Sequence, residues 1–270
     1  MLKLPKLNYC TIFEEGIITL EYIKTNKNYI SLINGFILSY KGNCLLKDII
    51  SYVHNLSSEL KQYCESNEHL LHCSKEKDKG MLGKIVEFSI FGNLPNSFSC
   101  PDLEYADIKV THFIKLKNNG YNAKERLTLT NIGDPMHEDT ITMFQNTLLL
   151  TDMPHYKKIQ KGVIIIAKYE LIDSLQNKNI MGIILYDLND IPQEDKDIIA
   201  DDYNKIRECI INKCPSQKGQ QYLHICRHSS KQYNTRAFAF TNKFLTKLVS
   251  FYLQIPLTNT GRSSYIHFTE

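Results

Sequence analysis

Residues 101–109 place charged side chains at a spacing that can do chemistry, in the order Pro-Asp-Leu-Glu-Tyr-Ala-Asp-Ile-Lys. If Asp107 begins a β-strand, its side chain and that of Lys109 lie on one face, because side chains alternate along a strand. Asp102 comes shortly before this strand and can turn back beside Asp107. Two carboxylates and an ammonium group at a sheet edge are the groups needed to hold a divalent cation and orient a water molecule for attack on phosphorus.

A third acidic side chain, Glu87, lies in an apolar stretch upstream. Residues 80–92 are mostly hydrophobic and contain Glu87 as their only carboxylate. An ionised group among such neighbours is unfavourable unless it has a partner. A metal ion shared with Asp102 and Asp107 would be that partner, so the sequence predicts one acidic site built from separate segments.

The elements that must position these residues are a helix and a strand hairpin. Hydrophobic spacing predicts a short buried helix over residues 80–92 and a strand over 105–116. Asn118, Asn119 and Gly120 are typical of a hairpin turn, and the alternating segment 126–130 is expected to return as the partner strand.

The remaining segments predict a mixed sheet with helices around it. Helical spacing is found at 44–65, 193–213 and 242–253, and strands are expected at 162–167, 180–186, 222–226 and 236–240. The tail from Pro256 is expected to be irregular. The fold class is therefore α/β, a mixed central sheet flanked by helices.

Composition restricts the function only weakly. The chain has 270 residues, 43% hydrophobic and 23% charged, which is ordinary for a globular protein of one large or two small domains. A formal net charge of +3 means that any nucleic-acid surface must come from local clustering of Lys and Arg.

Cysteine usage and hydropathy favour a cytoplasmic protein. The eight cysteines are scattered, form no Cys-x-x-Cys pair and follow no signal peptide, which is typical of free thiols in a reducing compartment. No apolar run reaches the roughly 18–20 residues of a membrane span, so no membrane partner is expected.

Two stretches of the chain resemble a known protein family. Residues 80–132, and more loosely 220–250, resemble the MutH family, which includes the mismatch-repair nicking enzyme and the Sau-type restriction endonucleases that cut at GATC. The matching pieces are Gly83-x-x-x-Glu87, Phe91-Gly92, Asn96-Ser97, Pro101-Asp102, Ala106 to Thr111, Lys115 to Asn118, Lys124 to Leu129, and Arg236 to Phe240. The Lys-Glu-Arg-Leu segment is more similar to the restriction enzymes.

The resemblance implies a restriction-endonuclease-like fold with a PD-(D/E)xK active site. Glu87, Asp102 and Asp107 would bind Mg²⁺, and Lys109 would be the catalytic lysine. The chain departs from the family in having Asp107 where Glu is more frequent, and in a gap between Asp102 and Asp107 about two residues shorter. Glu104 is the alternative ligand if that gap prevents Asp102 from reaching the site.

The resemblance also implies contacts to double-stranded DNA. Lys115, Lys117, Lys124 and Arg126 flank the expected hairpin and would contact phosphates. The segment 222–236 lies where the family carries its recognition loop and offers base-reading side chains, namely Arg227, His228, Lys231, Gln232, Asn234 and Arg236.

The expected function is therefore that of a Mg²⁺-dependent type II restriction endonuclease that reads GATC. Residues 1–75 are expected to pack on a nuclease domain spanning 76–270, without an assigned role. Cleavage of both strands would need two copies on the DNA, and host protection a cognate DNA methyltransferase. The alternatives are a catalytically impaired MutH-like DNA-binding module, a strand-nicking repair endonuclease, and an α/β interaction protein with a chance match.

Overall fold

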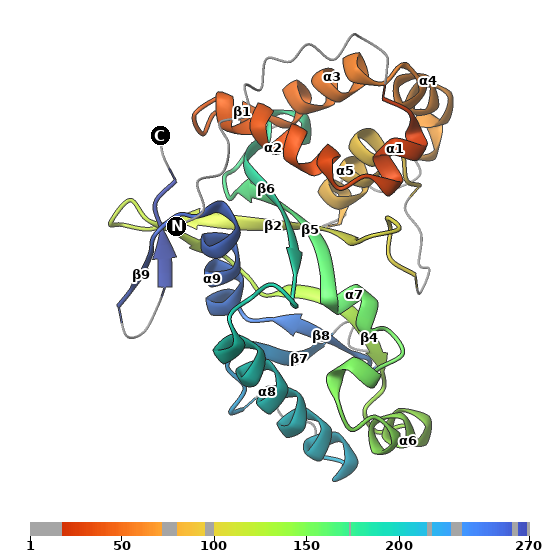
Figure 1. The fold of residues 1–270 in the computed structure, drawn as a ribbon, viewed down its shortest axis with the longest axis vertical. Helices are drawn as coiled ribbons and strands as arrows, with labels where there is room; N and C mark the ends of the chain where they lie inside the picture. The colour runs from red at the N-terminus through yellow and green to blue at the C-terminus, as the bar shows by residue number, and fades with distance from the viewer. Residues whose placement is uncertain are drawn as a thin grey trace. The chain divides into compact units, whose positions relative to one another are not determined.

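The computed structural model describes residues 18–71, 80–94, 100–172, 174–214, 218–227, 234–260 and 264–268. The chain forms two compact units (Figure 1). The first contains residues 1–97 and 171–183, and the second contains residues 98–170 and 184–269. The expected division into 1–75 and 76–270 stays a prediction. Among the described residues, no helix combines the length and the apolar character that crossing a membrane requires.

The first unit is mainly helical. Its elements are α1 (Leu20–Thr25), α2 (Asn28–Ser39), β1 (Cys44–Leu45), α3 (Leu46–Leu56), α4 (Ser58–Asn67), the 3-10 helices η1 (Glu68–Leu70) and η3 (Leu175–Asn177), and α5 (Met81–Phe91). The segment expected as one helix over 44–65 is thus two helices, because Ser57 leaves the helical conformation and its hydroxyl accepts a hydrogen bond from the Leu60 amide, 3.1 Å away, which begins α4.

The expected buried helix around Glu87 is present as α5. It packs against its neighbours in the first unit, and the Tyr29 hydroxyl donates a 2.6 Å hydrogen bond to the Ile90 carbonyl. Gly92 ends it in a left-handed conformation with φ of 66°. A Cβ atom at Gly92 would meet the Leu20 side chain at 2.7 Å, so both backbone and packing require glycine there.

The second unit contains most of the strands. Its elements are β2 (Asp107–Lys115), β3 (Tyr121–Ala123), β4 (Leu127–Gly133), α6 (Glu138–Asn146), η2 (Leu150–Asp152), α7 (Tyr156–Gln160), β5 (Lys161–Lys168), β6 (Asn179–Asp187), α8 (Gln193–Ile211), β7 (Leu223–Arg227), β8 (Arg236–Phe240), α9 (Asn242–Leu253), β9 (Leu257–Asn259) and β10 (Ser264–Ile266). The first residues of β6, 179–183, belong to the first unit.

Two sheets organise this unit. The larger has strand order β1-β6-β5-β2-β3-β10-β9, with β2 parallel to β5 and antiparallel to β3, and its β1 pairs with the part of β6 that belongs to the first unit. The smaller is antiparallel with order β4-β8-β7. Helix α9 packs on β3 and β10, α8 packs on β7, and α7 contacts both β4 and β5. The expected α/β class with a mixed sheet and flanking helices is therefore confirmed.

Two strand predictions were wrong. The partner of β2 in the hairpin is β3, which follows the turn at residues 116–120 directly, and 127–133 instead joins the smaller sheet. The hydrophobic alternation of 126–130 identified a strand but could not identify its partner, because alternation is the same for any sheet face. The tail is not irregular, since β9 and β10 pair with each other and β10 pairs with β3.

Candidate active site at the beginning of strand β2

Asp107 begins β2 and is almost completely buried, with 1% of its surface exposed. It lies opposite Gly162, the second residue of the parallel strand β5, so the beginnings of the two strands meet at one edge. Among the described residues, neither carboxylate oxygen of Asp107 has a hydrogen-bond partner. A buried carboxylate without donors is costly and requires a positive charge nearby.

Asp102 is brought beside Asp107 by a tight turn. The Leu103 amide donates a 2.9 Å hydrogen bond to the Ala106 carbonyl, and Oδ2 of Asp102 accepts a 2.9 Å bond from the Ile108 amide. Burial raises the pKa of Asp102, and the negative charge of Asp107 raises it further, while the bond from Ile108 opposes both. The short gap therefore still allows the two carboxyl groups to lie beside each other, which is one of the outcomes that the sequence left open.

Two lysines supply the positive charge at Asp107. Lys109, two residues along β2, forms an ion pair with Oδ2 of Asp107, which confirms that the two side chains share a face. Lys158 on α7 approaches Oδ1, with Nζ at 3.6 Å. The side chains of Lys109 and Lys158 are 23% and 15% exposed. Both are therefore mostly buried, which strengthens their attraction to Asp107, but part of each side chain still contacts water.

Lys158 is the site residue that sequence reasoning missed. It belongs to a five-residue helix that leads directly into β5. A parallel pairing of β2 with β5 places the beginnings of both strands at one edge, and a lysine just before β5 then reaches Asp107. Recognising this pairing was the signal that could have identified Lys158.

Close packing fixes the position of α7. Gly162 lies against the ring of Tyr186, and a Cβ atom at residue 162 would meet Cε1 of that ring at 2.5 Å. The Tyr186 hydroxyl donates a 3.2 Å hydrogen bond to the carbonyl of Ile159, the neighbour of Lys158. Burial raises the pKa of Tyr186, and the charge of Asp107 raises it further, so the phenol stays neutral and acts as a donor.

For the other two acids, the structure gives the element and the exposure. Glu87 lies half-buried on α5 in the first unit, and its role as a metal ligand stays a prediction. Glu104, the alternative ligand, is exposed at the tight turn. No group of three His, Cys, Asp or Glu side chains that could hold a metal occurs among the described residues.

The two adjacent carboxyl groups nevertheless fit Mg²⁺. This ion prefers oxygen ligands, keeps several waters and is commonly held by one or two carboxylates together with substrate phosphate. Asp107 offers two buried oxygens without hydrogen-bond donors in the described chain, and Asp102 adds a second acid beside them. A cation bound there would compete with Lys109 and Lys158 for Asp107.

The basic residues expected to contact DNA that the structure describes lie in two groups. Lys115, Lys117, Lys124 and Arg126 are all exposed around the β2–β3 hairpin and the start of β4. Nζ of Lys124 lies 3.3 Å from the ring centroid of Tyr169, and Nζ of Lys115 lies 5.9 Å from that of Tyr121. These cation–π contacts hold two of the ammonium groups at the surface.

Arg227 and Arg236 form the second group. They lie directly opposite each other at the end of the β7–β8 hairpin. Like charges at opposed positions of an antiparallel pair are destabilising, so a bound anion would relieve this pair. His228, Lys231 and Gln232 lie outside the described residues.

The geometry thus defines a mixed α/β protein with a buried aspartate, a second carboxyl group and two lysines at one sheet edge. No family model matches the chain, and no curated protein matches it.

Proposed function

We propose that this protein is a Mg²⁺-dependent endonuclease that hydrolyses phosphodiester bonds in double-stranded DNA at a short specific site, GATC. The observation that carries the proposal is the environment of Asp107. Its buried oxygens face the ammonium groups of Lys109 and Lys158, and a second carboxyl group, that of Asp102, lies beside it. Groups so arranged are typical of sites where charge is held for a reaction.

Each side chain has a role in this proposal. Asp102 and Asp107 would hold Mg²⁺, which supplies charge neutralisation and a bound water of lowered pKa when present. Lys109 orients the attacking water or takes its proton, and stabilises the charge that grows on the phosphoryl oxygens. Glu87, in the first unit, keeps the ligand role that the resemblance implies as a prediction.

Lys158 has a role that follows from its ion pair. An ammonium group has three donors, so Lys158 can keep Asp107 neutralised before substrate binds and then turn a donor toward a phosphate oxygen. The site therefore keeps its buried charge compensated in both states. The product would be a phosphodiester cut that leaves a 5′-phosphate.

The DNA would be held by the two basic groups. Lys115, Lys117, Lys124 and Arg126 would contact phosphates, and the β7–β8 hairpin with Arg227 and Arg236 would reach base edges. Such a protein carries a restriction-endonuclease-like fold of the MutH type. It would work in the cytoplasm, use two copies on a palindromic site and depend on a cognate methyltransferase.

Digestion of plasmid DNA that contains GATC sites tests the proposal. Wild type with Mg²⁺ is expected to give discrete fragments, and Lys109→Ala is expected to give none. Lys243→Ala, which changes an exposed lysine at the start of α9, is the control and should cut normally. Intact plasmid with wild-type protein across Mg²⁺ concentrations would overturn the nuclease proposal.

A DNA-binding module without cleavage is the second candidate. Two observations favour it. Among the described residues, no group of three possible metal ligands is found, and Asp107 is already ion-paired with two lysines. A gel shift on GATC duplexes without fragments would identify this module. Open-circle products with a preference for hemimethylated sites would instead identify a nicking enzyme.

A further inference from the structure

Two cysteines that the proposed function does not use lie at the C-terminal end of α8. Cys209 is in the last turn of the helix and is half-buried, whereas Cys214 follows the helix and is exposed. Both are free thiols in the structure. Two thiols held next to each other can form a disulfide within one chain, so their separation decides whether they act as a pair.

The backbone ends α8 with the two hydrogen bonds of a Schellman motif. The Cys214 amide donates a 2.8 Å bond to the Cys209 carbonyl, and the Lys213 amide donates a 2.9 Å bond to the Ile210 carbonyl. Lys213 has a φ of 55°, the left-handed conformation that this motif requires. The side chains at the positions of Cys209 and Cys214 frequently contact each other in this motif.

The longer of these two turns limits the separation of the cysteines. With standard backbone bond lengths, a 2.8 Å bond between the Cys214 nitrogen and the Cys209 oxygen keeps the two Cα atoms within about 6.7 Å. Disulfides usually join residues whose Cα atoms are roughly 4.4–6.8 Å apart. The backbone therefore already has the spacing of a disulfide-bonded pair.

Contacts with α6 hold the end of α8 in this geometry. Nζ of Lys213 lies 2.7 Å from a carboxylate oxygen of Glu138, the first residue of α6. The Arg207 guanidinium donates hydrogen bonds to the carbonyls of Phe144 and Gln145 in the last turn of α6, at 2.8 and 3.1 Å. The turn is thus anchored on both sides, and the cysteines are brought near each other before any reaction takes place.

The other cysteines that the structure describes are less suited to such a reaction. Cys44, Cys64 and Cys226 are buried, and burial raises the pKa of Cys44 to about 12 and that of Cys64 to about 11. Thiolate is the reactive form, so buried thiols of this kind are inert at neutral pH. Cys100 is exposed, but its nearest cysteine in the sequence is Cys73, so it provides a single-thiol control.

We propose that Cys209 and Cys214 form a reversible disulfide on reaction with a low-molecular-weight disulfide. The thiolate of the exposed Cys214 attacks one sulfur of the oxidant, forms a mixed disulfide and releases the other half as a thiolate. The thiolate of Cys209 then attacks the Cys214 sulfur, which forms the protein disulfide and releases the second half. The protein gives up two electrons and two protons, and the oxidant becomes two thiols.

The disulfide would fix the connection between α8 and β7 at its beginning. Asp202 on α8 already holds the other end of this connection, through the amides of Tyr222 and Leu223. A covalent bond across the turn also keeps the Lys213 and Cys214 amides in their hydrogen bonds. Oxidation should therefore slow hydrogen exchange of these two amides by at least about tenfold, because local opening of the helix end is restricted.

Equilibration of the whole protein with oxidised and reduced glutathione tests the proposal. After free thiols are blocked, trypsin cuts behind Lys213, between the two cysteines, so the disulfide should appear as peptide 208–213 joined to peptide 214–218. In a buffer that leaves Cys100 mostly reduced, the joined fraction should exceed the fraction of Cys100 that carries glutathione by at least about tenfold. The reason is that the second exchange step is intramolecular.

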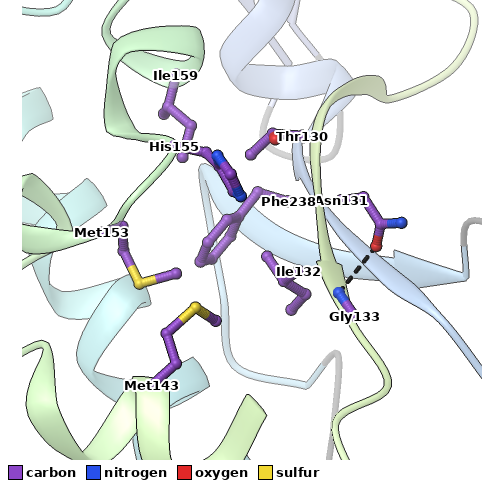
Figure 2. A pocket seen from close by; sticks show the side chains of 9 residues that line it. All are labelled: Thr130, Asn131, Ile132, Gly133, Met143, Met153, His155, Ile159 and Phe238. Carbon is purple, nitrogen blue, oxygen red and sulfur yellow. Dashed lines mark hydrogen bonds between the residues drawn. The ribbon is translucent and has the colours of Figure 1, made fainter. Parts of the chain in front are cut away.

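Glutathione disulfide is a better oxidant for this experiment than hydrogen peroxide, which also oxidises thioethers. The thioethers of Met143 and Met153 line a hollow beside β4 and β8 in the same unit (Figure 2). Oxidation of these two side chains would disturb packing near α6 and α8 and would obscure the effect of the thiol pair.

Three single variants complete the design, each checked for folding by circular dichroism. Cys209→Ser and Cys214→Ser should lose the joined peptides, and the cysteine that remains should carry glutathione to no greater extent than Cys100 does. Cys100→Ser leaves the pair intact and should behave as wild type.

The outcomes decide the proposal without DNA or Mg²⁺, so its failure is separate from failure of the proposed function. Separate glutathione adducts on Cys209 and Cys214 in wild type, or a disulfide from either residue to a different cysteine, would overturn it. A joined fraction no larger than the Cys100 adduct would do the same. Joined peptides in wild type and Cys100→Ser, absent from the other two variants, would establish the pair.

Discussion

Two buried aspartates in the same unit are held in opposite ways. Asp202 on α8 is fully buried, and its carboxylate accepts hydrogen bonds from the backbone amides of Gln221, Tyr222 and Leu223, at 2.8, 2.6 and 2.9 Å. Asp107 is equally buried, but its oxygens face the ammonium groups of Lys109 and Lys158 and not backbone amides.

The difference separates a carboxylate that builds the fold from one that is available for chemistry. Backbone amides cannot leave Asp202 without unfolding the approach to β7, so its charge is permanently compensated. Lysine side chains can rotate away from Asp107 and expose it to a cation or a phosphate. Burial alone therefore does not identify a functional acid, whereas the kind of partner does.

The largest expected effect comes from exchanging each aspartate for asparagine. Asp107→Asn should lower the cleavage rate by about 1,000-fold, because it removes charge from the metal site, and should lower the free energy of unfolding by less than Asp202→Asn does, because Lys109 and Lys158 can turn toward water. Asp202→Asn should leave the rate per folded molecule near wild type and lower the free energy of unfolding by about 3 kcal/mol, because the side-chain amide cannot accept all three bonds. Single-turnover cleavage and urea unfolding measure both. The reverse assignment of effects would break the comparison.

The two lysines of α7 give the next largest effect. Lys158→Ala should slow cleavage by about 100-fold, since it removes a cation from Asp107 and from the phosphate. Lys157→Ala changes its exposed neighbour in the same helix and should cut within about twofold of wild type, as is usual for surface changes. Equal loss in both variants would mean that the helix contributes only general basic charge.

The pH dependence of stability sharpens the comparison at Asp102. Its pKa is raised in the folded protein by burial and by Asp107, so the folded state binds the proton more tightly than the unfolded state. Stability therefore falls as pH rises from the unfolded pKa of about 3.9 through the raised folded value. Asp102→Asn should have a higher free energy of unfolding than wild type at pH 7, and this difference should vanish below about pH 3.9. The same variant should bind Mg²⁺ at least about tenfold more weakly. Urea unfolding across pH and Mg²⁺ titration of cleavage provide the measurements, and a loss of stability at pH 7 would contradict the expectation.

The smallest effect concerns His224, a half-buried ring whose Nε2 also has no hydrogen-bond partner among the described residues. Burial and the nearby charge of Arg126 lower its pKa from 6.5 to about 4, so the ring is neutral at pH 7. Its neutral form is favoured on folding, and the resulting stability is lost as pH falls from 6.5 toward 4. His224→Gln should therefore be about 1 kcal/mol more stable than wild type at pH 5, equal above pH 7.5, and fully active. If His224→Gln lost cleavage, a buried polar atom without a hydrogen-bond partner would be enough to identify a catalytic residue, and the contrast with Asp107 would fail.

The sequence was sufficient for the elements that depend on local pattern. The buried helix around Glu87, the central strands β5 and β6 and the long helix α8 follow from hydrophobic period and length, and the structure confirms them. Strand pairings between segments distant in the sequence could not be predicted from such local patterns. The move of β4 to the smaller sheet and the pairing of the C-terminal strands depend on tertiary contacts that no local pattern encodes.

The same limit explains what was found and missed at the site. Asp102, Asp107 and Lys109 are within eight residues, so strand alternation and one turn were enough to bring them together. Lys158 lies some fifty residues later in the chain, and the parallel pairing of β5 with β2 brings it beside Asp107. No local sequence pattern distinguishes Lys158 from its neighbour Lys157. The placement of Glu87 at the site stays a prediction.

The bond from the Ile108 amide to the Asp102 carboxylate makes residues 102–109 a self-contained segment. Its two acids and one lysine are arranged by its own backbone, and the remainder of the molecule needs only to offer a strand beside it. Such a segment is portable: grafted onto the edge strand of an unrelated sheet, it should carry its acidic pair with it.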